Sequence, residues 1–214
     1  MIEFHPTDDS LARLAAGTLE AGPTIVVRTH VDGCERCRNA VGRFEAVGGA
    51  LLNAIEPVAM KADAYALVEA RLDRPAPAPG APAPIRAVPA NGPIELPAAL
   101  EGLEIGRWRW LAPGVRRSRV TIPGAPDADL VMYRIGPNRR LPHHGHAGSE
   151  YTQVLSGSFF DETGHYRPGD LIEADGDVDH QPRVGPEGEC ICLAAVEGRM
   201  LPNGFFGRMM RPFV

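Results

Sequence analysis

The sequence contains no segment that resembles a membrane span or a secretion signal. Its longest apolar runs are a few residues long, whereas a helix needs about 20 apolar residues to cross a bilayer. Residues 1–5 lack the basic stretch and long apolar run of a signal peptide. Clusters of Lys and Arg, which a nucleic-acid surface requires, are also missing, and the net charge is -5. We therefore expect a cytoplasmic protein that contacts neither membrane nor nucleic acid directly.

Cysteine is scarce, and its placement argues against a disulfide framework. The 214 residues contain four cysteines in two close pairs, Cys34 with Cys37 and Cys190 with Cys192. In a cytoplasmic protein, such close spacing indicates metal or redox chemistry before structural disulfides. Cys190 and Cys192 fall on one face of a predicted strand. They are compatible with two small core residues or with a sensor of oxidants.

A proline-rich segment divides the chain. Residues 74–97 contain eight prolines, several of them alternating with alanine. This composition forms neither a helix nor a central strand, so we expect an extended, semi-stiff linker. It predicts one domain at 1–73 and another at 98–214, each able to fold alone. The first carries 7 Lys and Arg against 11 Asp and Glu, so any role in gene expression is expected to require a protein partner.

The apolar residues before the linker follow helical periods. The expected elements are a helix from Asp9 or Ser10 that ends at Gly22-Pro23, a short helix or strand over 24–30, a helix from Cys34 that Gly48-Gly49 weaken or interrupt, and a helix over 62–72 with Tyr65, Leu67, Val68 and Leu72 facing inward. About 70 residues in short helices make a thin core, so a bound metal or partner would add needed stability.

The segments after the linker have the alternating pattern of strands. The expected strands cover 108–110, 115–122, 130–135, 150–155, 157–160, 171–173 and 190–196. Turn residues separate them about every ten residues, which is typical of an all-β sandwich or barrel. The predicted fold class is therefore α + β multidomain, with a small helical domain followed by an all-β barrel.

Three residues before the linker have the spacing of a zinc site. His30 precedes Cys34 by four positions, and Cys37 completes a Cys-x-x-Cys motif. Two thiolates at a helix start and an imidazole from the preceding element occupy three corners of a tetrahedron, and the helix N-terminus favours thiolates. His5, the one other histidine before the linker, is the natural fourth ligand. The alternatives are a thioredoxin-like redox pair, which needs a βαβ setting absent here, and two half-buried thiols beside a surface histidine.

The His-x-x-x-Cys-x-x-Cys motif in a small acidic helical domain resembles the zinc-binding anti-sigma domain. The resemblance covers residues 1 to about 73. It implies that these helices wrap around an extracytoplasmic-function sigma factor and block its access to RNA polymerase. The expected partner is therefore a sigma factor, and the expected cofactor of this domain is zinc.

A second group of candidate ligands lies in the predicted barrel. His144 and His146 are two apart on a strand, so they point to the same face, and Glu150 begins the next strand and can reach the same ion. His180 lies ten residues beyond Asp170. Three imidazoles and one carboxylate are compatible with Zn, Fe, Mn or Ni. The alternative is a barrel that keeps these histidines without a metal.

The spacing His144-x-His146, then Glu150, Gly157 and a Pro-Gly-Asp turn before a later histidine, resembles the cupin signature. Together the two halves resemble the ChrR-type anti-sigma factors. That resemblance implies release of the bound sigma factor when photo-oxidative stress, such as singlet oxygen, reaches the barrel. The alternative is a metal-dependent cupin enzyme, a dioxygenase or isomerase, with an accessory zinc domain.

Overall fold

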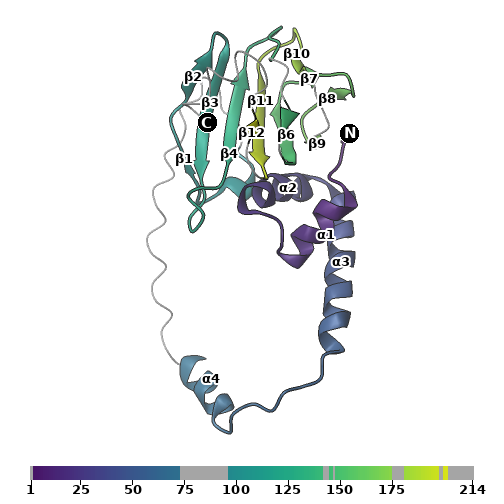
Figure 1. Cartoon of the computed structure of the whole chain (residues 1–214), viewed down its shortest axis with the longest axis vertical. Helices are drawn as coiled ribbons and strands as arrows, with labels where there is room; N and C mark the ends of the chain where they lie inside the picture. Colours follow the sequence, from purple (N-terminus) through teal and green to yellow (C-terminus); the bar gives the residue numbers. More distant parts are fainter. Residues whose placement is uncertain are drawn as a thin grey trace.

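The computed structural model describes residues 2–72, 96–141, 145–146, 148–174, 181–197 and 200–201. Four helices come first, and a β barrel follows, as the fold class predicts (Figure 1). The helices are α1 (Asp8–Ala16), α2 (Ala21–Gly33), α3 (Glu35–Asn53) and α4 (Ala64–Leu72), and a 3-10 turn, η1, covers Ala98–Leu100. Within the described residues, no helix combines the length and apolarity needed to cross a membrane.

The first two helices differ from their expected boundaries. Thr7 caps α1 by accepting a hydrogen bond from the backbone N–H of Ser10, and Gly17 ends this helix well before the expected stop. Gly22 and Pro23 instead lie in the first turn of α2, where a missing proline N–H costs nothing. The segment 24–30 is therefore helical, which decides between the two expected alternatives.

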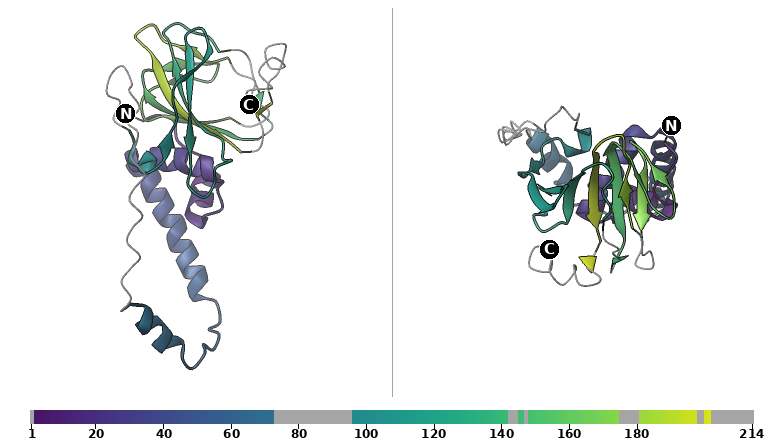
Figure 2. Two further views of the ribbon diagram at one scale, coloured as in Figure 1. Left: turned by 90° about the vertical axis from the view of Figure 1, so that its left-hand side faces the viewer. Right: turned by 90° about the horizontal axis from the view of Figure 1, so that it is seen from above.

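The last two helices overturn two expectations. The helix α3 runs unbroken through Gly48-Gly49, because an interior glycine costs about 1 kcal/mol but does not by itself end a helix. No residue of α4 is buried, so the prediction that one face of this helix points inward is wrong. Leu67 and Val68 are 53% and 54% exposed, respectively. Figures 1 and 2 show α3 extending away from the barrel and α4 lying apart from it.

The barrel is built from antiparallel strands. The strands are β1 (Glu104–Ile105), β2 (Arg109–Ala112), β3 (Val115–Thr121), β4 (Leu130–Ile135), β5 (Gly145–His146), β6 (Glu150–Ser156), β7 (Phe159–Phe160), β8 (His165–Tyr166), β9 (Leu171–Ala174), β10 (Arg183–Val184), β11 (Cys190–Val196) and β12 (Met200–Leu201). The largest sheet has the order β1-β3-β4-β11-β6-β9, with β2 beside β3, and smaller sheets have the orders β10-β7-β8 and β12-β5. All seven expected strands occur in the largest sheet or in the smaller sheets. The strands that the sequence analysis did not predict are each two residues long.

All seven residues of the central strand β11 are buried. Cys190 and Cys192 belong to the core cluster of the barrel interior. Leu193, on the opposite face, belongs to a second cluster that also contains Val26 and Cys37 from the helices. Successive strand residues point to opposite faces, so the helices cover the outside of the sheet. The helices and the barrel therefore share one of the two core clusters, which the linker composition did not indicate.

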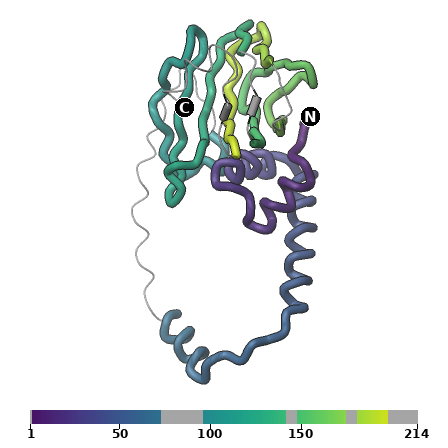
Figure 3. The backbone as a smooth tube through the Cα atoms, viewed as in Figure 1, coloured from purple at the N-terminus to yellow at the C-terminus, as the bar shows by residue number. Residues whose placement is uncertain are grey.

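Polar contacts also join the helices to the barrel. Arg13 donates two hydrogen bonds to the carboxylate of Glu197, at 2.9 and 2.5 Å. The hydroxyls of Ser10 and Tyr151 lie 3.2 Å apart. The N-terminal segment of the chain runs beside the segment that contains β8 and β9 (Figure 3). The linker at 74–97 lies almost entirely outside the described residues, so the boundaries at 73 and 98 stay predictions.

Gly157 of the cupin-like spacing occupies a position that no other residue tolerates. Its φ is 72°, and an added Cβ would lie 2.2 Å from the carbonyl oxygen of Glu189. We expect Gly157→Ala to lower the free energy of unfolding by about 3 kcal/mol or more, because strain and a backbone clash add. Chemical denaturation measures this loss. Gly188→Ala is the matched control, since an added Cβ there meets nothing within 4 Å; equal stability of the two variants would contradict the account.

Candidate metal centre

The structure brings the four candidate ligands before the linker into one cluster. One ligand atom from each of His5, His30, Cys34 and Cys37 lies within 4.8 Å of the others. His5 precedes α1, and His30 is in the last turn of α2. Cys34 is the N-cap of α3 and Cys37 lies in its first turn. The short connection between α2 and α3 therefore positions three of the ligands, and the N-terminal segment carries the fourth.

The distances within this cluster fit a tetrahedral ion. His5 Nδ1 lies 3.3 Å from His30 Nε2, 3.5 Å from Cys34 Sγ and 3.4 Å from Cys37 Sγ. With zinc–nitrogen bonds of about 2.05 Å and zinc–sulfur bonds of about 2.3 Å, a tetrahedron separates two nitrogens by about 3.3 Å and a nitrogen from a sulfur by about 3.5 Å. These four residues can therefore hold one metal ion in their midst.

Hydrogen bonding alone does not account for the position of His5. A ring nitrogen carries either one proton or one lone pair, so His5 Nδ1 can make one good hydrogen bond, yet three donor or acceptor atoms surround it. A shared cation satisfies all of them at once. Both thiols and His30 are buried, at 5%, 1% and 1% exposure, which rules out half-buried thiols beside a surface histidine.

The electrostatics of His30 suit a metal ligand. Burial, the largest cause, lowers the pKa of His30 to about 4, so its imidazole is neutral at pH 7. Its Nδ1 lies 2.9 Å from the carbonyl oxygen of Gly169. Donation of the Nδ1 proton to that carbonyl directs the Nε2 lone pair toward the cluster, as in many metal-bound histidines.

The Cys37 thiol needs a nearby cation to ionise. Burial, followed by the neighbouring Cys34, raises the pKa of the Cys37 thiol. A coordinated metal ion deprotonates such a thiol outright. The N-terminus of α3 adds a favourable partial positive charge. Two sulfurs and two imidazole nitrogens are a typical structural zinc donor set.

The second group of candidate ligands is only partly within the described residues. Glu150 begins β6, is 9% exposed and accepts a hydrogen bond of 3.1 Å from the Thr152 hydroxyl. The backbone of His146 pairs with Met200, but the side chain of His146, together with all of His144 and His180, lies outside the described residues. Metal binding in the barrel therefore stays a prediction.

Cys190 and Cys192 lie close together inside the barrel. Both side chains are buried, and their sulfurs are 3.5 Å apart without a disulfide. The hydrogen bond from Cys190 and burial raise the pKa of Cys192, so Cys192 is a neutral thiol at pH 7.

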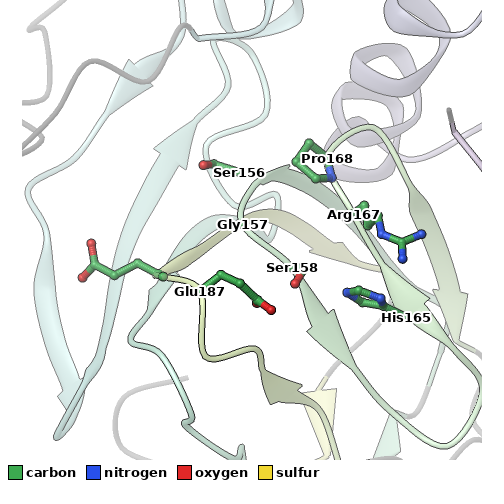
Figure 4. Close-up of a pocket in the computed structure, with 9 residues that line it drawn as sticks. Ser156, Gly157, Ser158, His165, Arg167, Pro168 and Glu187 are labelled. Carbon is green, nitrogen blue, oxygen red and sulfur yellow. The ribbon is translucent and has the colours of Figure 1, made fainter.

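An open pocket of about 530 Å³ lies at one end of the barrel (Figure 4). Its walls include Ser158, His165 and Arg167. His165 is on β8, and its ring stacks on that of Phe160 with 3.8 Å between the ring centroids. None of the described residues that line this pocket is a predicted ligand.

Sequence reasoning missed the barrel residues that surround the N-terminal cluster. It identified the Pro-Gly-Asp motif at 168–170 as a turn before a strand, which is correct because β9 follows it. It did not place this turn against His5 and His30, since the contacts span more than 130 residues. No feature of the local sequence indicates such a contact.

Comparisons with known proteins agree with both halves of the chain. The family model for the ChrR cupin-like domain matches residues 103–198. Anti-sigma-E factor ChrR of Cereibacter sphaeroides is 38% identical over 213 residues, covering 99% of this chain and 98% of that protein. The crystal structure of Rhodobacter sphaeroides SigE in complex with the anti-sigma ChrR matches with a TM-score of 0.75 and 38% identity, covering 92% of this chain and 100% of that chain. Because this identity extends over nearly the whole length of both chains, the chain belongs to the family of the anti-sigma factor ChrR.

Proposed function

We propose that this protein is a cytoplasmic anti-sigma factor. It binds and inhibits an extracytoplasmic-function sigma factor and releases it under photo-oxidative stress such as singlet oxygen. The observation that carries the proposal is the 38% identity with anti-sigma-E factor ChrR along 99% of the chain. The metal of the N-terminal centre is zinc, and the barrel holds zinc or another divalent transition metal.

The exposed apolar side chains support a protein partner. Of the twelve large apolar side chains that are exposed among the described residues, ten lie between Val47 and Leu72. They are Val47, Leu51, Leu52, Ile55, Val58, Met60, Tyr65, Leu67, Val68 and Leu72, and we call them the apolar arm. Exposed apolar surface gathered on one part of a protein marks an interaction site.

The helix α4 also supports a partner. It has nine residues, none of them buried, and isolated helices of this length are marginal in water. Contact with another protein would supply the missing packing. The sigma factor is thus expected to lie against the distal half of α3 and against α4.

The zinc ion would have a structural role in this arrangement. Bound zinc supplies a closed cross-link with four protein ligands and no open position for a substrate. The ligands join the N-terminal segment, α2 and α3. They therefore set the direction in which α3 carries the apolar arm. This arrangement supports a regulator rather than a cupin enzyme.

Co-expression with an extracytoplasmic-function sigma factor from the same genome tests the proposal. We expect the two proteins to co-purify and a sigma-dependent reporter to be silent until the cells are exposed to singlet oxygen. Separate elution of the two proteins, with reporter output unaffected by this chain, would refute an anti-sigma function.

The predicted barrel ligands should be needed for the response but not for inhibition. We expect Glu150→Ala to keep the reporter silent without stress and to abolish its induction by singlet oxygen, because Glu150 lies inside the barrel and does not belong to the apolar arm. Reporter output with and without singlet oxygen measures both effects. Glu187→Ala, on the exposed surface, is the control and should respond normally. A normal response in Glu150→Ala would exclude this residue from sensing.

A further inference from the structure

The segment that carries His5 is anchored on the barrel. The backbone N–H groups of Glu3 and Phe4 donate hydrogen bonds of 2.7 and 3.1 Å to one carboxylate oxygen of Asp170. Asp170 is 1% exposed. The backbone N–H of Leu171 donates to the carbonyl oxygen of Phe4 at 3.2 Å. The residues immediately before His5 therefore pair with the start of β9.

The ring of Phe4 adds an apolar anchor next to His5. It lies 4.5 Å from the ring of Tyr166, measured between centroids. The ring also fills the space above Gly164, where an added Cβ would lie 2.7 Å from it. His5 itself precedes α1, so no helix fixes its backbone. These contacts with the barrel hold His5 in place.

The same barrel turn also holds His30. The carbonyl oxygen of Gly169 lies 2.9 Å from His30 Nδ1. The second carboxylate oxygen of Asp170 accepts a hydrogen bond of 2.8 Å from the backbone N–H of Arg167. One closed turn, Arg167 to Asp170, thus contacts both histidines or their immediate neighbours.

We propose that the turn 167–170 of the barrel is the outer shell of the N-terminal metal centre, and that Asp170 and Phe4 are positioning residues of that centre. The inference rests on the metal proposed above. Groups that orient metal ligands commonly change metal affinity about 10- to 100-fold when they are removed. Through linkage, a displacement of the turn weakens the metal centre, and the bound metal in turn stabilises the docking of helices on the barrel.

Metal release from the full-length protein tests the proposal. Cobalt(II) replaces zinc, because the thiolate-to-cobalt charge-transfer absorption reports only on a cysteine-ligated site and ignores a barrel site of histidines and carboxylate. The decay of this absorption after addition of excess EDTA gives the release rate. We expect about tenfold faster release for Asp170→Asn and for Phe4→Ala than for the unchanged protein.

Two further variants separate positioning from a general loss of stability. Phe160→Ala removes a different aromatic ring of the barrel. Among the described ring contacts, Phe160 stacks on His165, whereas Phe4 packs on Tyr166, so the release rate of Phe160→Ala should match that of the unchanged protein. The double variant of Phe4 and Asp170 should release cobalt little faster than either single variant, because both act on one anchor.

If Asp170→Asn and Phe4→Ala released cobalt at the rate of the unchanged protein, the inference would be overturned, but the proposed metal centre would not be affected. Equal acceleration by Phe160→Ala would also overturn it, since barrel stability would then be the cause. If the unchanged protein gave no thiolate absorption with cobalt, the proposed metal centre would fail with it. None of these measurements depends on a sigma factor.

Discussion

Cys37→Ser is expected to remove one equivalent of metal per chain and to unfold the helical part of the protein. Structural zinc contributes an apparent 10–16 kcal/mol of binding free energy, about as much as the whole stability of a typical domain. Cys37 also lies in the core cluster that joins the helices to the barrel, so the loss extends to the outer face of the sheet. Metal analysis and the helical circular dichroism signal measure the two effects.

The matched control for this substitution is Cys190→Ser. It makes the same chemical change at a buried cysteine that is not part of the four-residue cluster. We expect it to keep the thiolate-to-cobalt absorption of the N-terminal centre and most of the helical signal. Full metal content in Cys37→Ser would show that this residue is not a ligand.

Charges on the apolar arm are expected to abolish sigma binding. Leu51 and Leu52 are 67% and 68% exposed, so replacing both with glutamate costs little folding free energy. Buried in an interface, the two carboxylates would instead remain unpaired. We expect the dissociation constant to rise at least a hundredfold, which corresponds to about 3 kcal/mol. Titration calorimetry with the purified sigma factor measures this change, and a sigma-dependent reporter should become constitutively active.

Trp110→Glu is the control for the apolar arm. Trp110 is also 68% exposed, but it lies on β2 of the barrel. This variant should bind the sigma factor normally. The double variant of Leu51 and Leu52 and the Trp110→Glu variant should both retain the metal content and the circular dichroism of the unchanged protein, which would show that they fold. Tight binding by the Leu51 and Leu52 variant would place the sigma factor elsewhere.

The local sequence was sufficient for several features of this protein. Alternating segments and short apolar runs predicted the long strands of the barrel, and β4 and β11 have the expected bounds. The spacing of His30, Cys34 and Cys37 predicted their proximity, because α2 ends and α3 begins within this short segment. The structure brings these residues together with His5.

Other features depend on contacts between distant segments. Helical period did not reveal which apolar faces are covered, and Tyr65 and Leu72 proved to be exposed. The proline-rich linker suggested independent halves, whereas α2 packs against the outside of the barrel. Both faces of β11 are buried, one in the barrel interior and one beneath the helices. A strand that is covered on both faces needs apolar residues at every position, which explains its unbroken apolar run.

The sequence by itself determined the order of helices and strands, the ligand types and the family resemblance, because these depend on neighbouring residues and their spacing. Only the tertiary structure decided that the barrel turn at 167–170 supports His5 and His30. It also decided that the distal part of α3 and α4 are left uncovered. Both outcomes depend on which apolar surfaces pack together, and the local sequence marks a surface as apolar without indicating which distant segment covers it.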